Sequence, residues 1–281
     1  MDYGKPKTKR QTCVKGSCIQ GLHINANLPG KAWVGHTPFA YWLITVVKPK
    51  ILVELGTHGG GSYFTFCDSI KDNEIQTKAY AVDHWQGEEH SGSYTETVYD
   101  QIKRTNDEYY ANFSSLLRKG FDEALSNFSD GTVDLLHIDG FHSYDAVTTD
   151  FNSWFSKLSD ESVVLLHDTH EKKEGFGVHL FWEELKTKYP EQCFEFMHSH
   201  GLGIIFPKSL SAANNFRIAC GPKIDELFEL FSLIGDTVYY QNNGRYSLQK
   251  NIQITVQQLQ QTLINIKANH PTLASNLKSL L

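Results

Sequence analysis

Residues 51–62 read ILVELGTHGGGS, and this stretch decides the fold that we expect for the chain. Its first five residues form an apolar run between Pro49 and Gly56, which predicts a buried strand. The glycines that follow permit a tight turn and the close approach of a ligand to the backbone, and a helix is expected from Ser62. Their spacing differs from the G-x-G-x-x-G dinucleotide fingerprint, and no Lys-Ser/Thr pair follows them as in a phosphate-binding P-loop. A turn whose glycines serve packing alone is the alternative.

Strand and helix signals alternate from this stretch outward to about residue 206. Thr37 is expected to cap a first helix, with Pro38 in its first turn. Further helices are expected at 62–71, 97–111, 121–127 and 144–157, and further strands at 79–82, 114–117, 133–138, 162–167, 194–197 and 202–206. Strands that are nearly continuous apolar runs, separated by helices, indicate a parallel sheet covered on both faces. The predicted fold class is therefore α/β, with a doubly wound, mostly parallel sheet.

Four acidic residues fall at or near the predicted carboxyl ends of these strands, namely Glu54, Asp83, Asp139 and Asp168. In doubly wound sheets, ligands bind in the crevice outside these ends, near the point where the strand order reverses. One acid at such a place would mean little, but four in succession predict a functional site.

Composition excludes several classes of protein. The chain has 281 residues, of which 40% are apolar, which suits one large globular domain or a domain with an appendage. Its formal charge of −6 argues against broad nucleic-acid binding. The longest strongly apolar run, 39–47, is about half the roughly 20 residues of a membrane-spanning helix. Five scattered cysteines and a polar N-terminus without a secretory signal favour a cytoplasmic protein.

The chain divides into three predicted regions. Residues 1–32 are a polar N-terminal arm, 33–210 are the α/β domain, and 211–281 are a helical C-terminal extension. Within the extension, apolar residues recur at helical spacing from 248 to 266. This stripe would pack either on its own domain or on a second copy of the chain, as in a homo-oligomer.

Three motifs together resemble a known family. They are Glu-Leu-Gly-x-x-x-Gly-x-Ser at 54–62, Ile-Asp-Gly-Phe-His-Ser-Tyr at 138–144 and Leu-His-Asp-Thr at 166–169. Over about residues 33–206 the chain resembles class I S-adenosylmethionine-dependent methyltransferases, which have a Rossmann-like fold. The resemblance is to O-methyltransferases of sugars and macrolide sugars, and more distantly to catechol O-methyltransferase.

The resemblance implies a binding site for S-adenosylmethionine. Gly56 and Gly60 would let the backbone approach the methionine portion, and Ser62 would bind its carboxylate. Glu54 would lie beneath the loop, holding backbone or the amino group, and Asp83 would accept the two ribose hydroxyls. The other expected cofactor contacts are Asp139 and Trp85. Trp85 and Phe121 would border the adenine, although an aromatic residue at either position is as readily part of the core.

The resemblance also implies a metal and a base. Asp139 and Asp168 would hold a divalent cation such as Mg²⁺, with Thr169 standing where catechol-type enzymes have an asparagine ligand. His142 would be the general base, acting with Asp139 as the catalytic pair. If no metal is bound, the aspartates would bind substrate hydroxyls and backbone amides directly. His167 is expected to be structural, and His170 is a candidate extra ligand.

The predicted activity is methyl transfer from S-adenosylmethionine to a hydroxyl of a sugar or glycoconjugate. A polar loop at 85–94 would cover the site as a lid or substrate loop, or would be a solvated connection. Two alternatives remain open at this stage. One is a scaffold that keeps the fold without activity, and the other is a nicotinamide-dependent oxidoreductase, which the glycine spacing disfavours.

Overall fold

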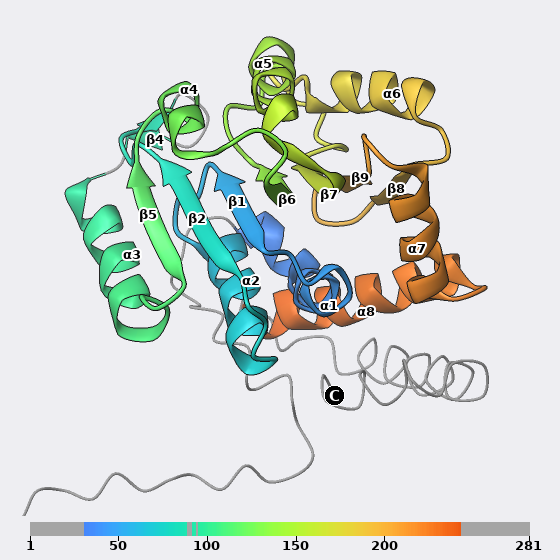
Figure 1. The fold of residues 1–281 in the computed structure, drawn as a ribbon, viewed down its shortest axis with the longest axis horizontal. Coiled ribbons are helices and arrows are strands. Elements are labelled where there is room, and N and C mark those ends of the chain that lie inside the picture. Colours follow the sequence, from blue (N-terminus) through green and yellow to red (C-terminus); the bar gives the residue numbers. More distant parts are fainter. Residues whose placement is uncertain (1–30, 89–91, 94, 243–281) are drawn as a thin grey trace, which may run out of the picture.

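The computed structural model describes residues 31–88, 92–93 and 95–242, and its centre is a seven-stranded sheet (Figure 1). The strands are β1 (Ile51–Leu55), β2 (Lys78–Asp83), β5 (Ser114–Arg118), β6 (Val133–Ile138), β7 (Leu158–His167), β8 (Cys193–Phe196) and β9 (Leu202–Ile205). A separate two-stranded ribbon joins β3 (Gly87–Glu88) to β4 (Gly92–Ser93).

The strand order is β5-β2-β1-β6-β7-β9-β8. The first five strands are parallel, β9 runs antiparallel to β7, and β8 pairs antiparallel with β9. From β1 the chain first builds outward through β2 and β5 and then crosses back to β6 on the other side. The strand order therefore reverses between β1 and β6, which is where a doubly wound sheet opens a crevice for ligands. The predicted fold class is confirmed.

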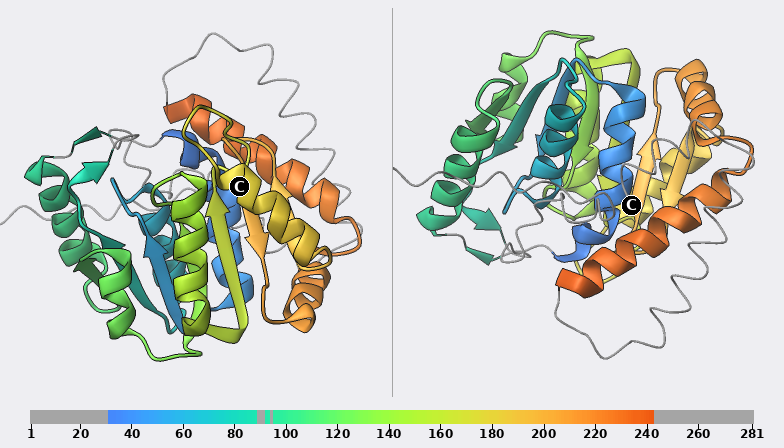
Figure 2. Two further views of the ribbon diagram at one scale, coloured as in Figure 1. Left: turned by 90° about the horizontal axis from the view of Figure 1, so that it is seen from above. Right: turned by 90° about the horizontal axis from the view of Figure 1, so that it is seen from below.

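Helices cover both faces of the sheet (Figure 2). One face is covered by α1 (Thr37–Val47), α2 (Gly61–Asp72), α3 (Glu96–Tyr109), α7 (Leu210–Cys220) and α8 (Ile224–Asn242), together with the 3₁₀ helix η2 (Lys31–His36). The other face is covered by α4 (Phe121–Ala124), α5 (Tyr144–Trp154) and α6 (Val178–Lys188), with the short 3₁₀ turns η3 (Leu125–Asn127) and η4 (Phe155–Lys157). Neighbouring residues of a strand face opposite sides, so Leu52 belongs to the first core and Val53 to the second.

Two local predictions differ from the structure. Thr37 lies within α1, and the position before the helix is His36, whose backbone is already helical because η2 leads directly into α1. No extended residue is present there to act as a side-chain cap. The helix α6 was not predicted, although Val178, Phe181 and Trp182 are buried from it at helical spacing.

The last described helices are part of the same core as the sheet. Phe231 of α8 packs against Phe39 and Trp42 of α1, with ring centroids 5.7 and 5.3 Å apart. Within the described ranges, no helix combines the length and apolarity needed to cross a membrane. Three predicted segments lie wholly or partly outside the described residues: the stripe at 248–266, residues 1–30 of the arm predicted at 1–32, and residues 89–91 and 94 of the predicted lid loop.

Candidate active site

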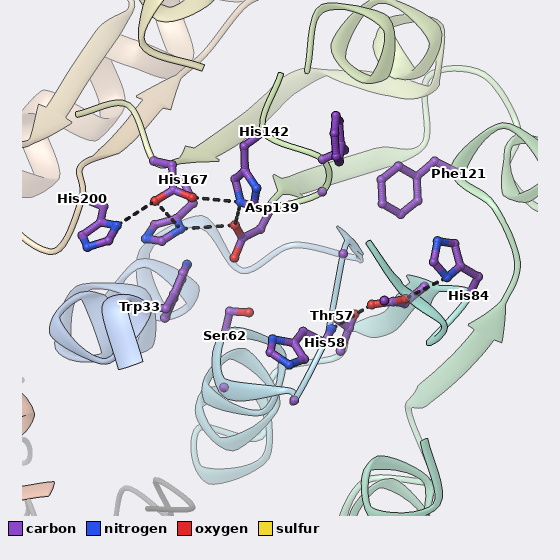
Figure 3. A pocket seen from close by; sticks show the side chains of 18 of the residues that line it. Trp33, Thr57, His58, Ser62, His84, Phe121, Asp139, His142, His167 and His200 are labelled. Atoms are coloured by element: carbon purple, nitrogen blue, oxygen red, sulfur yellow. Dashed lines mark hydrogen bonds and ion pairs between the residues drawn. The ribbon is translucent and has the colours of Figure 1, made fainter. Parts of the chain in front are cut away.

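A pocket of about 370 Å³ lies at the carboxyl ends of the parallel strands, beside the reversal in strand order (Figure 3). Its walls come from the loops that follow β1, β2, β5, β6 and β7, joined by Trp33 of η2 and His200 from the β8–β9 loop. Of the residues predicted for the site, Gly56, Ser62, Asp83, Asp139, His142 and Asp168 line this pocket. The sheet brings them together because each follows or ends a neighbouring parallel strand.

Residues 56–61, which we call the glycine loop, contain four glycines whose surroundings differ. Gly56 has φ +86°, and a Cβ there would lie 2.1 Å from the backbone oxygen of Asp139, so this position requires glycine. Gly59 and Gly61 line the pocket, and a Cβ on Gly61 would meet open space. Gly60 does not line it. That residue precedes α2 with φ +78° and packs against the ring of Phe64.

Asp83 is buried and held in one orientation. Its Oδ2 accepts a hydrogen bond from the His58 backbone N–H at 2.8 Å, and its Oδ1 accepts one from the Trp85 N–H at 2.6 Å. A carboxylate offers about four acceptor positions, so two remain for a ligand. The Trp85 indole does not line the pocket. It is buried, and its Nε1–H donates to the backbone oxygen of His58 at 3.0 Å, which braces the glycine loop.

Glu54 precedes the glycine loop at the end of β1 and is fully buried without lining the pocket. It pairs in register with His137 of β6, and its Oε2 lies 2.8 Å from His137 Nδ1. Burial raises the pKa of the Glu54 carboxyl, while His137 and the Ser62 hydroxyl act against that rise.

Two carboxylates and two imidazoles form a cluster at the other end of the pocket (Figure 3). His142 Nε2 lies 2.9 Å from Asp168 Oδ2 and 3.7 Å from Asp139 Oδ1. His167 Nδ1 lies 3.2 Å from Asp139 Oδ1. One ligand atom from each of Asp139, His142 and Asp168 lies within 4.8 Å of the others, which is close enough for a single metal ion to contact all three. His167 is buried, its Nε2 lies 3.2 Å from the backbone oxygen of Ser199, and it also lines the pocket.

The charges in this cluster stabilise one another. Burial alone would lower the pKa of both imidazoles, but Asp139 and Asp168 raise the pKa of His142 to about 10 and that of His167 to about 9. Burial alone would raise the pKa of Asp139, but His167 and His142 hold it well below its usual range. Because these raised pKa values depend on the negative charge of the two carboxylates, a divalent cation bound to Asp139 and Asp168 would lower them and favour the neutral imidazole that a general base requires.

Two residues considered as metal ligands lie elsewhere. Thr169 is buried outside the pocket wall, and its Oγ1 lies only 2.5 Å from where a Cβ on Gly201 would be. His170 Nε2 lies 3.0 Å from Glu195 Oε1, away from the aspartates.

His200 lies beside Asp168, with its Nδ1 3.3 Å from Asp168 Oδ1. No motif signalled His200, because it reaches the site from an antiparallel hairpin distant in sequence.

Aromatic side chains form much of the remaining wall. Phe121 lines the pocket, as its suggested place beside the adenine would require, and packs over Gly140. The ring of Phe176 stacks on His142, with centroids 4.7 Å apart and planes 20° apart. Trp33 comes from η2, and sequence reasoning missed it because nothing in its immediate neighbourhood distinguishes it from a core residue.

A protein-family model and a curated relative each match part of the chain. A protein-family model described as a methyltransferase domain matches residues 53–169. The uncharacterized protein y4gI of Sinorhizobium fredii (strain NBRC 101917 / NGR234) is 47% identical over 178 residues, which are 63% of this chain and 19% of that protein. This chain therefore matches about a fifth of the length of that relative.

Solved structures resemble the chain at low sequence identity. A protein from Corynebacterium glutamicum is 12% identical with a TM-score of 0.49, over 69% of this chain and 91% of its own. The O-methyltransferase TomG of Streptomyces achromogenes, solved with S-adenosylmethionine, is 12% identical with a TM-score of 0.46, over 68% and 89%. The methyltransferase PaMTH1 of Podospora anserina, solved with S-adenosylhomocysteine, is 11% identical with a TM-score of 0.47, over 68% and 88%.

Proposed function

We propose that this chain, whose residues 53–169 match a methyltransferase-domain family model, is a class I methyltransferase that transfers a methyl group from S-adenosylmethionine to a hydroxyl of a sugar or glycoconjugate. One observation carries the proposal. A single pocket has the glycine loop and an oriented Asp83 at one end and the cluster of Asp139, His142 and Asp168 at the other. A methyl donor and an acceptor hydroxyl would therefore meet between them.

The residues present fit the methyl donor. The open side of Gly61 leaves room for a ligand close to the loop, and Asp83 keeps two acceptor positions. Glu54 Oε1 is a buried acceptor that no hydrogen bond of standard geometry reaches from the described residues. Asp83 would hold the ribose hydroxyls, and Ser62 and Glu54 would hold the carboxylate and ammonium groups. When bound, the donor supplies an electrophilic methyl carbon on a sulfonium.

The cluster at the acceptor end would position and deprotonate the hydroxyl. His142 is the proposed base, and stacking on Phe176 fixes the plane of its ring. Asp139 and Asp168 would hold a divalent cation, and the alternative role for His142 is that of its third protein ligand in place of Thr169. Carboxylate oxygens suit Mg²⁺ or Mn²⁺, and such a cation lowers the pKa of a hydroxyl that it contacts.

A sugar acceptor is supported by the chemistry of the wall around the cluster. Trp33 and Phe176 contribute apolar side chains to this wall, while Asp139 and Asp168 offer charged acceptors for hydroxyl groups. A sugar presents both surfaces, because its hydroxyls project around a ring that has apolar faces.

Titration and methylation assays test this function. Calorimetry should show binding of S-adenosylmethionine and no binding of NAD, and mass spectrometry should show one added methyl group on a responsive glycoside. A chelator should abolish the transfer, and added Mg²⁺ should restore it. Absence of S-adenosylmethionine binding would refute the proposal, whereas transfer that resists the chelator would remove only the metal from it.

A further inference from the structure

Two buried hydrogen bonds in series join the 3₁₀ helix η2 to Glu54, which precedes the glycine loop. Trp33 Nε1 donates to His137 Nε2 at 3.2 Å, and His137 Nδ1 lies 2.8 Å from Glu54 Oε2. Trp33 is 4% exposed, and His137 and Glu54 are 0% exposed. The three residues come from η2, β6 and β1, and Trp33 lies 104 positions from His137 in the sequence.

When both hydrogen bonds are made, from Trp33 to His137 and between His137 and Glu54, only one assignment of donors and acceptors is possible. An indole N–H can only donate, so His137 Nε2 must accept. The imidazole proton is then on Nδ1, which donates to Glu54 Oε2. Trp33 therefore selects the tautomer of His137, and that tautomer fixes one oxygen of the Glu54 carboxylate.

The second carboxylate oxygen of Glu54, Oε1, is the last atom in this series of hydrogen-bonding groups. Glu54 Oε1 is buried, and among the described residues no hydrogen bond of standard geometry reaches it. Its polar neighbour on the pocket side is Ser62, whose hydroxyl lies close enough to lower the pKa of the carboxyl. A buried acceptor left unpaired is unfavourable, so Oε1 is suited to a ligand group that brings both N–H donors and positive charge.

We propose that Trp33 and His137 are positioning residues that hold Glu54 ready for the ammonium group of the methyl donor. This inference rests on the proposed function. It also gives α8 a role in the site, because α8 supports the helix that carries Trp33. The two elements approach so closely that a Cβ on Gly235 would lie 1.8 Å from the backbone oxygen of Gly35.

Trp33→Phe tests the inference, because it keeps an aromatic ring and removes the indole N–H. We expect the Kd of S-adenosylhomocysteine, which carries the ammonium group, to rise about tenfold. The Kd of 5′-methylthioadenosine, which lacks that group, should change less than about twofold. Equal weakening of both ligands, or an unchanged Kd for S-adenosylhomocysteine, would overturn the inference. If the parent protein binds neither ligand, the proposed function fails first and the inference fails with it.

Two further variants separate positioning from structural support. A glutamine amide can accept from Trp33 and donate to Glu54, so His137→Gln should keep the Kd of S-adenosylhomocysteine near the parent value. His137→Leu should raise that Kd as Trp33→Phe does. In a Glu54→Gln background, Trp33→Phe should cause little additional loss, because the group being positioned is already altered. Additive losses, or failure of His137→Gln to restore binding when it folds, would count against positioning.

Trp154 supplies the matched control. It is a fully buried tryptophan in the core on the opposite face of the sheet, and its Nε1 has no hydrogen-bond partner. Trp154→Phe should lower the melting temperature and leave both dissociation constants unchanged. A selective loss of S-adenosylhomocysteine binding in this control would show that loss of any buried indole produces the effect, and would overturn the inference.

Discussion

His142 is the residue on which the proposed chemistry depends most. It contacts both aspartates of the cluster, so it is placed to act as the base or as a third metal ligand. His142→Ala should lower turnover by about 10²- to 10⁴-fold and leave the Kd of S-adenosylhomocysteine unchanged. Parent-like binding of Mn²⁺ in this variant would identify a base, and weakened binding would identify a ligand.

The control for this change is His179→Ala, on α6 and outside the pocket wall, which should retain full turnover. A fully active His142→Ala variant would show that the resemblance placed the catalytic residue wrongly.

Asp83 is the residue on which cofactor binding should depend most. Asp83→Ala removes the proposed acceptor of the ribose hydroxyls, so the Kd of S-adenosylmethionine should rise about 10- to 100-fold. The same carboxylate holds the backbone N–H groups of His58 and Trp85, so some loss of thermal stability is expected as well.

Calorimetric titration measures the affinity of the Asp83→Ala variant, and a thermal melt confirms that it is folded. Asp83→Asn, which keeps one acceptor oxygen, should fall between the parent and the alanine variant. Unchanged affinity in a folded Asp83→Ala variant would remove Asp83 from the site.

At the scale of elements, α5 carries a buried acid close to the loop that follows β6. Burial, with a smaller contribution from Asp122, raises the pKa of Asp150 to about 7. Its Oδ2 lies 3.4 Å from where a Cβ on Gly140 would be. Because the pKa is higher in the folded state than in the unfolded state, folding favours the protonated form. The contribution of Asp150 to the free energy of unfolding is fully present below about pH 4, and it is lost as the pH rises through about 7 and the carboxyl ionises.

Asp150→Asn should therefore stabilise the protein at pH 8 by about 1–4 kcal/mol and have little effect at pH 4. Urea unfolding at the two pH values measures the difference. Asp160→Asn, at an exposed position on β7, is the control and should change stability by less than about 0.5 kcal/mol at either pH. A destabilised Asp150→Asn variant at pH 8 would contradict this prediction.

At the scale of the whole molecule, α8 belongs to the core of the domain. The apolar stripe predicted at 248–266 follows it in the sequence and would pack on this domain or on a second copy of the chain. Phe231 is buried against α1, so Phe231→Ala should lower the free energy of unfolding by about 3–5 kcal/mol. A chain ending at residue 242 should keep its affinity for S-adenosylhomocysteine, because the residues that line the pocket all lie between Trp33 and His200.

Light scattering on that shortened chain tests whether the apolar stripe at 248–266 joins subunits. A smaller assembly than that of the full chain would support the predicted homo-oligomer. An unchanged mass would show that the stripe does not join subunits.

Local patterns determined the doubly wound sheet. The apolar run of β1 and the glycines after it specify strand, turn and helix within twelve residues, and the same alternation recurs to β9. Because parallel strands end at one edge of the sheet, the patterns also predicted that Asp83, Asp139 and Asp168 share a pocket. These inferences succeeded because each depends on periodicity or on the position of a residue relative to its own strand.

Contacts between distant segments were decided only by the tertiary structure. The sequence predicted Thr169 beside the aspartates, but the loop after β7 turns its side chain towards Gly201, and His200 reaches Asp168 from another hairpin. Trp33 meets His137 because η2, which packs against α8, brings it over that end of the sheet. Such contacts depend on how whole elements pack in three dimensions, so no local spacing in the sequence could specify them.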